Sequence, residues 1–181
     1  ERNAFLALLD KIKFRNKLGQ SSQELVVELE TLWNKLDTLS QDTEMSVLYA
    51  RTLIQFGDHA KAENFIRHKL NQKWSEELIF EYGNIDQGTY KKLLANCENW
   101  LKKEPASANL YLVCGRLSQS MMLWGKAKDY YEQALALDSQ NEALAELSRL
   151  LKAMGETKAS QDLMMINLNH ASKRLKALPL P

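Results

Sequence analysis

The chain has 181 residues, of which 45% are hydrophobic and 26% charged, a composition that excludes an intrinsically disordered protein. Its formal net charge of +1 excludes a generally basic nucleic-acid-binding protein, and we predict no nucleic-acid partner. Leucine (31) and alanine (17) far outnumber valine, isoleucine and threonine (4, 6 and 6), which excludes an all-β fold and favours helices.

Apolar residues recur at helical spacing through nearly the whole chain. The first helix is marked by Phe5, Leu8, Leu9 and Ile12, and the second by Leu25, Leu29, Leu32, Trp33 and Leu36. Later breaks fall at Gly57-Asp58, Gly83 to Gly88, Glu104-Pro105, Leu123 to Gly125, Asp138 to Asn141 and Gly155-Glu156. These breaks give about ten helices in short-linked pairs, and no apolar run reaches the roughly 18 residues of a membrane-spanning helix.

The helix pairs fit a repeat of about 34 residues. Units in this frame begin near Thr43, Glu76, Ala108 and Asn141. Small residues then fill position 8 (Ala50, Gly83, Gly115, Ser148) and position 20 (Ala62, Ala95, Ala127, Ser160) of every unit. This pattern resembles the tetratricopeptide repeat (TPR), in which the two helices of a unit cross at these positions.

We therefore predict an all-α, right-handed TPR-type solenoid. Residues 1–42 are expected to form an N-terminal helix pair, followed by four units at 43–75, 76–107, 108–140 and 141–174. The second unit has an irregular turn, with Asp86 at a usually bulky position, so its first helix should be short. Apolar residues from Leu163 to Leu178 predict one long helix over 157–178 that caps the array.

Position 9 of each unit should point into the concave face, which TPR arrays use to hold peptides. It is occupied by Arg51, Asn84, Arg116 and Arg149, and position 5 beside it by Val47, Phe80, Leu112 and Ala145. A guanidinium holds a carboxylate through two parallel hydrogen bonds, so this groove suits an apolar ligand with carboxylates, such as an acidic peptide or a porphyrin. The alternative is that the arginines are solvated or paired with Glu44, Glu77 and Glu142.

The sequence contains no catalytic motif and no metal-ligand spacing, because His59, His68 and His170 are isolated and the glycine patterns of nucleotide-binding loops are absent. We predict that the protein is not an enzyme and has no metal or resident cofactor, with haem or porphyrin considered only as a ligand. Cys97 and Cys114 are expected to be packed thiols, and Met121-Met122 and Met164-Met165 to be core residues.

Residues 25–170 also resemble the C-terminal part of the bacterial HemY family of TPR proteins. The resemblance rests on the order of the segments W, YAR, GD, KW, YG, WLKK-P, GRL and LWGKA. It implies an inner-membrane protein whose N-terminal anchor is absent from this chain and whose family is encoded with haem-biosynthesis enzymes. The flavin-dependent oxidase that shares the name is unrelated, and this chain lacks its dinucleotide-binding motif.

The resemblance thus implies a non-enzymatic scaffold for protein–protein interaction in membrane-associated haem or porphyrin biosynthesis. Its partners would be proteins, haem-biosynthesis enzymes among them, and this piece of the chain would be a soluble domain at the bacterial inner membrane. The two unpaired cysteines favour the cytoplasmic side slightly. The alternative function is a tetrapyrrole-binding or carrier module that uses the arginine-lined groove.

Overall fold

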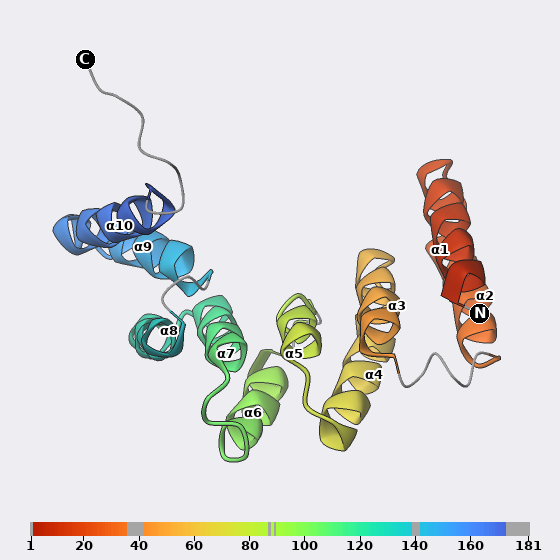
Figure 1. The fold of residues 1–181 in the computed structure, drawn as a ribbon, viewed down its shortest axis with the longest axis horizontal. Coiled ribbons are helices and arrows are strands. Elements are labelled where there is room, and N and C mark those ends of the chain that lie inside the picture. Colours follow the sequence, from red (N-terminus) through yellow and green to blue (C-terminus); the bar gives the residue numbers. More distant parts are fainter. Residues whose placement is uncertain (1, 36–41, 87, 89, 139–141, 173–181) are drawn as a thin grey trace. The chain divides into compact units, whose positions relative to one another are not determined.

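The computed structural model describes residues 2–35, 42–86, 88, 90–138 and 142–172, with side chains as far as Ile166. Over this part of the chain all regular structure is helical, as predicted (Figure 1). The helices are α1 (Arg2–Lys17), α2 (Ser22–Trp33), α3 (Thr43–Gln55), α4 (His59–Gln72), α5 (Glu76–Tyr82), α6 (Tyr90–Leu101), α7 (Ala108–Ser120), α8 (Trp124–Leu137), α9 (Ala143–Ala153) and α10 (Thr157–Ser172).

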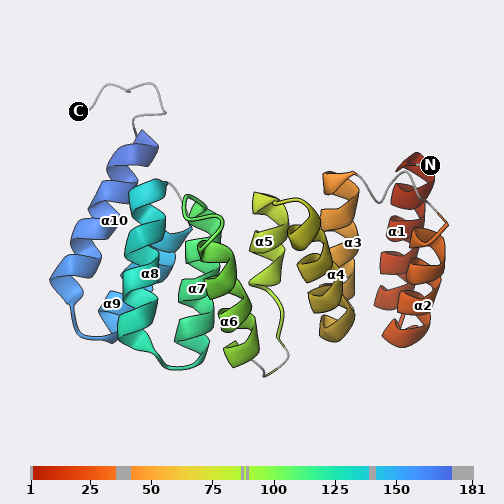
Figure 2. The ribbon, with the colours of Figure 1, turned by 90° about the horizontal axis from the view of Figure 1, so that it is seen from below.

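The chain divides into two compact units, residues 1–88 with α1 to α5 and residues 89–181 with α6 to α10. Within each unit successive helices pack side by side, as α1 with α2 and α9 with α10 in Figures 1 and 2. The division lies inside the second predicted repeat, 76–107. None of the described helices is long and apolar enough to cross a membrane.

Aromatic side chains hold the core of the first unit together. Trp33 of α2 stacks on Tyr49 of α3 with ring centroids 4.4 Å apart, and Phe65 of α4 meets the Trp33 ring edge-on at 5.6 Å. Phe5 of α1 completes the cluster at 5.4 Å from Trp33. Since these four rings come from four helices, each helix of the first two pairs is fixed by the same apolar cluster.

The predicted crossing positions are confirmed in three of the four repeats. Ala50 and Ala62 are fully buried. A Cβ placed on Gly115 would lie 2.4 Å from the ring of Tyr131, so α7 and α8 approach too closely for any side chain there. In the last pair Ser148 and Ser160 are buried, with their hydroxyl oxygens 3.0 Å apart and the Ser160 hydroxyl donating to the Ser148 carbonyl at 2.8 Å.

The second repeat departs from the frame. Its first helix, α5, is short with seven residues, as predicted, and Gly83 ends it as the C-cap residue. Ala95, however, is exposed rather than buried at a crossing, and Leu93 is the fully buried residue in the first turns of α6. Because α5 is six residues shorter than α3 while the turn after it is four residues longer, α6 begins two residues earlier in its repeat than α4 does, which counting along the chain did not detect.

The predicted capping helix begins at Thr157 as expected, and α10 is described to Ser172; residues 173–178 lie outside the described residues. The expectation that the methionine pairs are core residues is wrong for Met122, Met164 and Met165, which are exposed. Ile166, assigned to the capping face, is exposed as well. Cys97 and Cys114 are buried free thiols, as predicted.

The α3–α4, α7–α8 and α9–α10 turns share one hydrogen-bond pattern. The N–H groups of Asp58, Leu123 and Glu156 donate to the carbonyls of Leu53, Ser118 and Leu151 at 3.0, 2.9 and 2.9 Å. This Schellman arrangement needs a left-handed residue just before the donor. Gly57 (φ 80°) and Gly155 (φ 83°) supply it in two turns, whereas Met122 (φ 60°) stands there in the third. A side chain in this conformation costs about 1–2 kcal/mol, so the α7–α8 turn is strained.

The same turn also lacks a helix cap. Asp58 begins α4 by accepting from the Lys61 N–H at 3.1 Å. Leu123 stands at the corresponding place before α8 and forms no side-chain cap hydrogen bond. An apolar residue in place of a capping residue costs about 1 kcal/mol. The α7–α8 turn is therefore unfavourable for two independent local reasons.

Candidate binding site

In the first unit Arg51 is paired with a buried carboxylate. Arg51 Nε and Nη2 donate to Glu81 Oε1 at 2.9 and 2.6 Å, and the Asn84 amide donates to Glu81 Oε2 at 3.4 Å. The Glu81 side chain is 4% exposed, so its charge requires these donors. The first trio, Arg51, Glu81 and Asn84, therefore joins α3 to the end of α5 and has one cation for one anion.

In the second unit the same arrangement has a second arginine. Arg149 Nη2 lies 2.7 Å from Glu146 Oε2, and Arg116 Nε lies 3.9 Å from Glu146 Oε1. Burial raises the pKa of the neighbouring Tyr131, as does the Glu146 charge, while the two arginines oppose that rise. The Arg149 side chain is 65% exposed, against 47% for Arg51, and its partner Glu146 is 21% exposed, against 4% for Glu81. The second trio, Arg116, Glu146 and Arg149, thus presents a guanidinium to solvent.

The four predicted position-9 residues therefore fall into two trios, one in each compact unit. Both trios are built around a glutamate at position 6, which the sequence interpretation did not single out. Two of the three predicted alternative partners have other contacts, since Glu44 pairs with Arg2 and Glu77 accepts from the Ser75 hydroxyl. A signal for the true partners was present in the sequence, because Glu81 and Glu146 occupy the same place in their repeats.

The predicted apolar row at position 5 is mostly unavailable to a ligand. Val47 and Leu112 are buried in the cores of their units, Phe80 is half-buried, and Ala145 is exposed. Leu112 is only 1% exposed because α7 packs against both α6 and α8, so its assignment to a groove surface is wrong. The apolar surface beside an exposed arginine must come from other residues.

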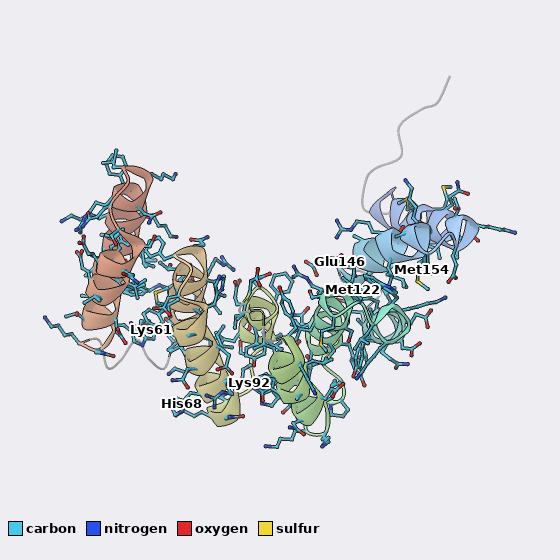
Figure 3. The ribbon with its side chains drawn as sticks, turned by 180° about the vertical axis from the view of Figure 1, so that it is seen from behind. Lys61, His68, Lys92, Met122, Glu146 and Met154 are labelled. Carbon is cyan, nitrogen blue, oxygen red and sulfur yellow. The ribbon has the colours of Figure 1, made fainter. Side chains whose placement is uncertain are left out.

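Such a surface exists next to Arg149, as a pocket of about 600 Å³. It is lined by Gln119 of α7, Trp124 of α8, Arg149, Leu150 and Ala153 of α9, and the α9 C-cap residue Met154. Figure 3 shows Met122, Glu146 and Met154 on this unit. Trp124 and Met154 are exposed, so the pocket opens to solvent. We call it the Arg149 pocket; none of its six lining residues is acidic.

The polar groups of the Arg149 pocket are hydrogen-bond donors. The Tyr131 hydroxyl donates to Gln119 Oε1 at 2.8 Å, which occupies the acceptor of this amide and leaves its N–H groups for a ligand. Arg149 contributes its exposed guanidinium, and Trp124 an indole N–H. A pocket with an apolar wall, a cation and neutral donors is complementary to a carboxylate carried on an apolar body.

A second cleft, of about 360 Å³, lies in the first unit over the aromatic rings of Trp33, Tyr49 and Phe65. Its rim carries an internal ion pair, because Lys61 Nζ lies 2.9 Å from Glu30 Oε2. Lys69 also lines this cleft, but so does the acidic residue Glu30, whereas the lining of the Arg149 pocket contains no acidic residue. The Arg149 pocket is therefore the stronger candidate for binding a charged ligand.

The described residues contain no group of acidic, histidine or cysteine side chains that could hold a metal ion. His59 accepts a hydrogen bond from the Asp86 N–H at 3.3 Å, and His68 contacts Gln72 at 2.9 Å. The side chain of His170 lies outside the described residues. These contacts give His59 and His68 structural partners within their own unit.

Comparison with solved structures identifies the fold. The chain is similar to TTC0263, a thermophilic TPR protein of Thermus thermophilus, with a TM-score of 0.64 and 20% identity over 93% of this chain and 92% of that one. It is also similar to MamA from Desulfovibrio magneticus RS-1, with a TM-score of 0.60 and 16% identity over 95% and 98% of the two chains. The fold is thus that of TPR proteins. No protein-family model and no curated protein matches the chain.

Proposed function

We propose that the protein is a non-enzymatic TPR-type scaffold that holds a carboxylate-bearing segment of a partner protein in the Arg149 pocket. The observation that carries this proposal is the lining of the pocket, which combines an exposed guanidinium and amide donors with an apolar wall and contains no acidic residue. TPR proteins expose such surfaces for protein recognition rather than for chemistry. Arg149 would form the charge-assisted hydrogen bonds, and Trp124 and Met154 the apolar contact.

The HemY-like order of sequence segments supplies the context of the proposal. It supports a role in membrane-associated haem or porphyrin biosynthesis, with haem-biosynthesis enzymes as the partners and an inner-membrane location. Co-purification from native membranes, with the parent and an Arg149→Ala variant in parallel, tests this context. Loss of a haem-biosynthesis enzyme from the variant sample is the expected result, and its equal recovery in both samples would contradict it.

Binding of a defined probe tests the site itself. The probe is a fluorescein-labelled 16-residue helical peptide with leucines on one face, flanked by glutamates, and its control replaces every glutamate by glutamine. We expect the acidic peptide to bind at least about 10-fold more tightly than its control, and Arg149→Ala to remove this difference. Arg15→Ala is the matched control, because Arg15 is also paired with a partly exposed glutamate, Glu28, but lies in the first unit. Equal binding of the two peptides would overturn the carboxylate site.

Tetrapyrrole binding is the second candidate function. The apolar wall of a 600 Å³ pocket beside a guanidinium supports it, since a porphyrin is flat, apolar and carries carboxylates. Addition of protoporphyrin or haem to the purified chain would shift the Soret band at stoichiometric ligand if this function is correct. A shift that persists in Arg149→Ala would exclude the Arg149 pocket as the binding site.

A further inference from the structure

Three consecutive apolar residues, two in the α7–α8 turn and one at the start of α8, are exposed to solvent. Met122 is 72% exposed, and Leu123 and Trp124 are exposed as well. At the same places the α3–α4 turn has Gly57, Asp58 and His59, and the α9–α10 turn has Gly155, Glu156 and Thr157. Turns of this geometry in the same chain are therefore otherwise polar, and the apolar sequence is not required by the backbone conformation.

The strain at Met122 is not offset by burial of the Met122 side chain. Met122 adopts a left-handed conformation that suits glycine, and yet its side chain gains little burial. Leu123 leaves α8 without a side-chain cap and is itself exposed. Local strain that the fold does not need occurs preferentially at binding sites.

The turn is continuous with the Arg149 pocket. Trp124, the first residue of α8, directly follows the turn and forms a wall of the pocket, and Met154, the C-cap residue of α9, adds exposed apolar surface at the same pocket. A segment whose carboxylate reaches Arg149 would therefore meet Met122 and Leu123 with its neighbouring residues. The two exposed side chains extend the apolar contact beyond the volume of the pocket.

We infer that the Met122-Leu123-Trp124 segment is a docking element, and that the partner segment is an acidic amphipathic helix with large apolar side chains next to its carboxylates. This inference rests on the proposed function, because Arg149 and Gln119 supply the charge complementarity that selects an acidic partner. It adds that the apolar face of the partner packs on the strained turn. A methionine suits this contact because its flexible side chain adapts to such a face.

A graft of the protein's own favourable turn tests the inference. The variant Met122→Gly, Leu123→Asp copies Gly57-Asp58 into the α7–α8 turn. The glycine relieves the backbone strain, and the aspartate supplies the side-chain cap that α8 lacks. We expect its Tm to rise by at least about 2 °C, while its affinity for the acidic leucine-faced peptide falls at least about 10-fold. Stability and binding should thus change in opposite directions, which loss of folding could not produce.

Two further variants complete the experiment. Leu137→Ala, at the far end of α8, removes another exposed apolar side chain and should leave peptide affinity unchanged. Trp124→Ala should weaken binding of the acidic peptide, and a peptide with serines in place of leucines should bind all variants equally weakly. An unchanged Tm in the graft would overturn the assignment of strain at Met122.

The outcomes separate this inference from the proposed function. If Arg149→Ala weakens binding and the graft does not, the docking role of the turn is wrong and the carboxylate pocket stands. If the graft weakens binding and Arg149→Ala does not, the turn docks apolar segments and the carboxylate pocket is wrong. A concentration-dependent dimer in sedimentation that the graft abolishes would identify a second copy as the occupant and overturn the inference.

Discussion

Gly115 has no side chain beyond a hydrogen atom, and this allows α7 to approach α8 closely. A methyl group there would lie 2.4 Å and 2.5 Å from two carbons of the buried Tyr131 ring. Gly115→Ala gains about 1 kcal/mol of helix propensity but overpacks the crossing at about 1–3 kcal/mol. We therefore expect a net loss of stability, measured by urea unfolding. Gly125→Ala is the control, since its Cβ would meet nothing within 4 Å, and it should leave stability equal or higher. A stabilised Gly115→Ala variant would contradict the crossing.

The thiol of Cys97 should be chemically silent in the folded protein. Burial raises its pKa well above the ordinary 9.0, and a hydrogen bond with Cys114 adds to the rise. Because only the thiolate reacts, iodoacetamide should label Cys97 slowly between pH 7 and 9 and rapidly in urea, as followed by mass spectrometry. Because folding raises the pKa of Cys97, the thiol contributes to the free energy of unfolding in full below about pH 9. This contribution is lost as the pH rises toward the pKa of Cys97 in the folded protein. Fast labelling of Cys97 in the native protein at pH 8 would contradict this prediction, because it would show that α6 and α7 separate often enough to expose the thiol.

At the scale of the helices, the two trios should differ in what they contribute. Arg51→Ala would leave the Glu81 carboxylate, 4% exposed, with only a long amide contact, and we expect a loss of about 1–3 kcal/mol in unfolding free energy. Arg149→Ala removes an exposed side chain and should change stability by less than about 0.5 kcal/mol. Urea denaturation of the two variants measures the difference. Similar losses in both would mean that the trios have the same structural role.

The helix pairs were predictable because two helices can cross closely only where their side chains are small. Small residues must stand where two helices cross, and Gly115, Ala127, Ser148 and Ser160 could be found by counting along the sequence. The count fails at α6, where Leu93 rather than Ala95 is buried, because the turn after a seven-residue helix changes the phase. Helix boundaries and phase depend on contacts that form only after folding.

The candidate site was predictable only in part. Position 9 was recognised for Arg51 and Arg149, but the only protein partners considered for them were the glutamates at position 2, because nothing in the repeat count shows which face meets the next helix. The pocket residues Trp124 and Met154 were not singled out as binding residues, because the repeat count does not show which apolar residues stay exposed. Met122 carried a visible signal, since it stands where Gly57 and Gly155 stand in other turns.

At the scale of the whole molecule, the division into residues 1–88 and 89–181 has an energetic consequence. Arg51→Ala and Gly115→Ala lie in different compact units and share no partner. Their effects on unfolding free energy should add to within about 0.5 kcal/mol in a double-mutant cycle. A larger coupling, of either sign, would show that the two units are energetically linked through these positions.

The two trios carry a consequence for how an array of this kind can lengthen. Each member of the second trio follows its counterpart by 65 residues: 116 after 51, 146 after 81 and 149 after 84. Position 6 alternates along the chain, with Leu48 and Val113 in the first and third repeats and a glutamate in the second and fourth. If a single repeat were duplicated, a position-9 arginine would face the leucine or valine at position 6 of the next repeat. If two consecutive repeats were duplicated, each arginine would still face a glutamate. A longer array built from this sequence would therefore keep these ion pairs only if it were extended by two repeats at a time.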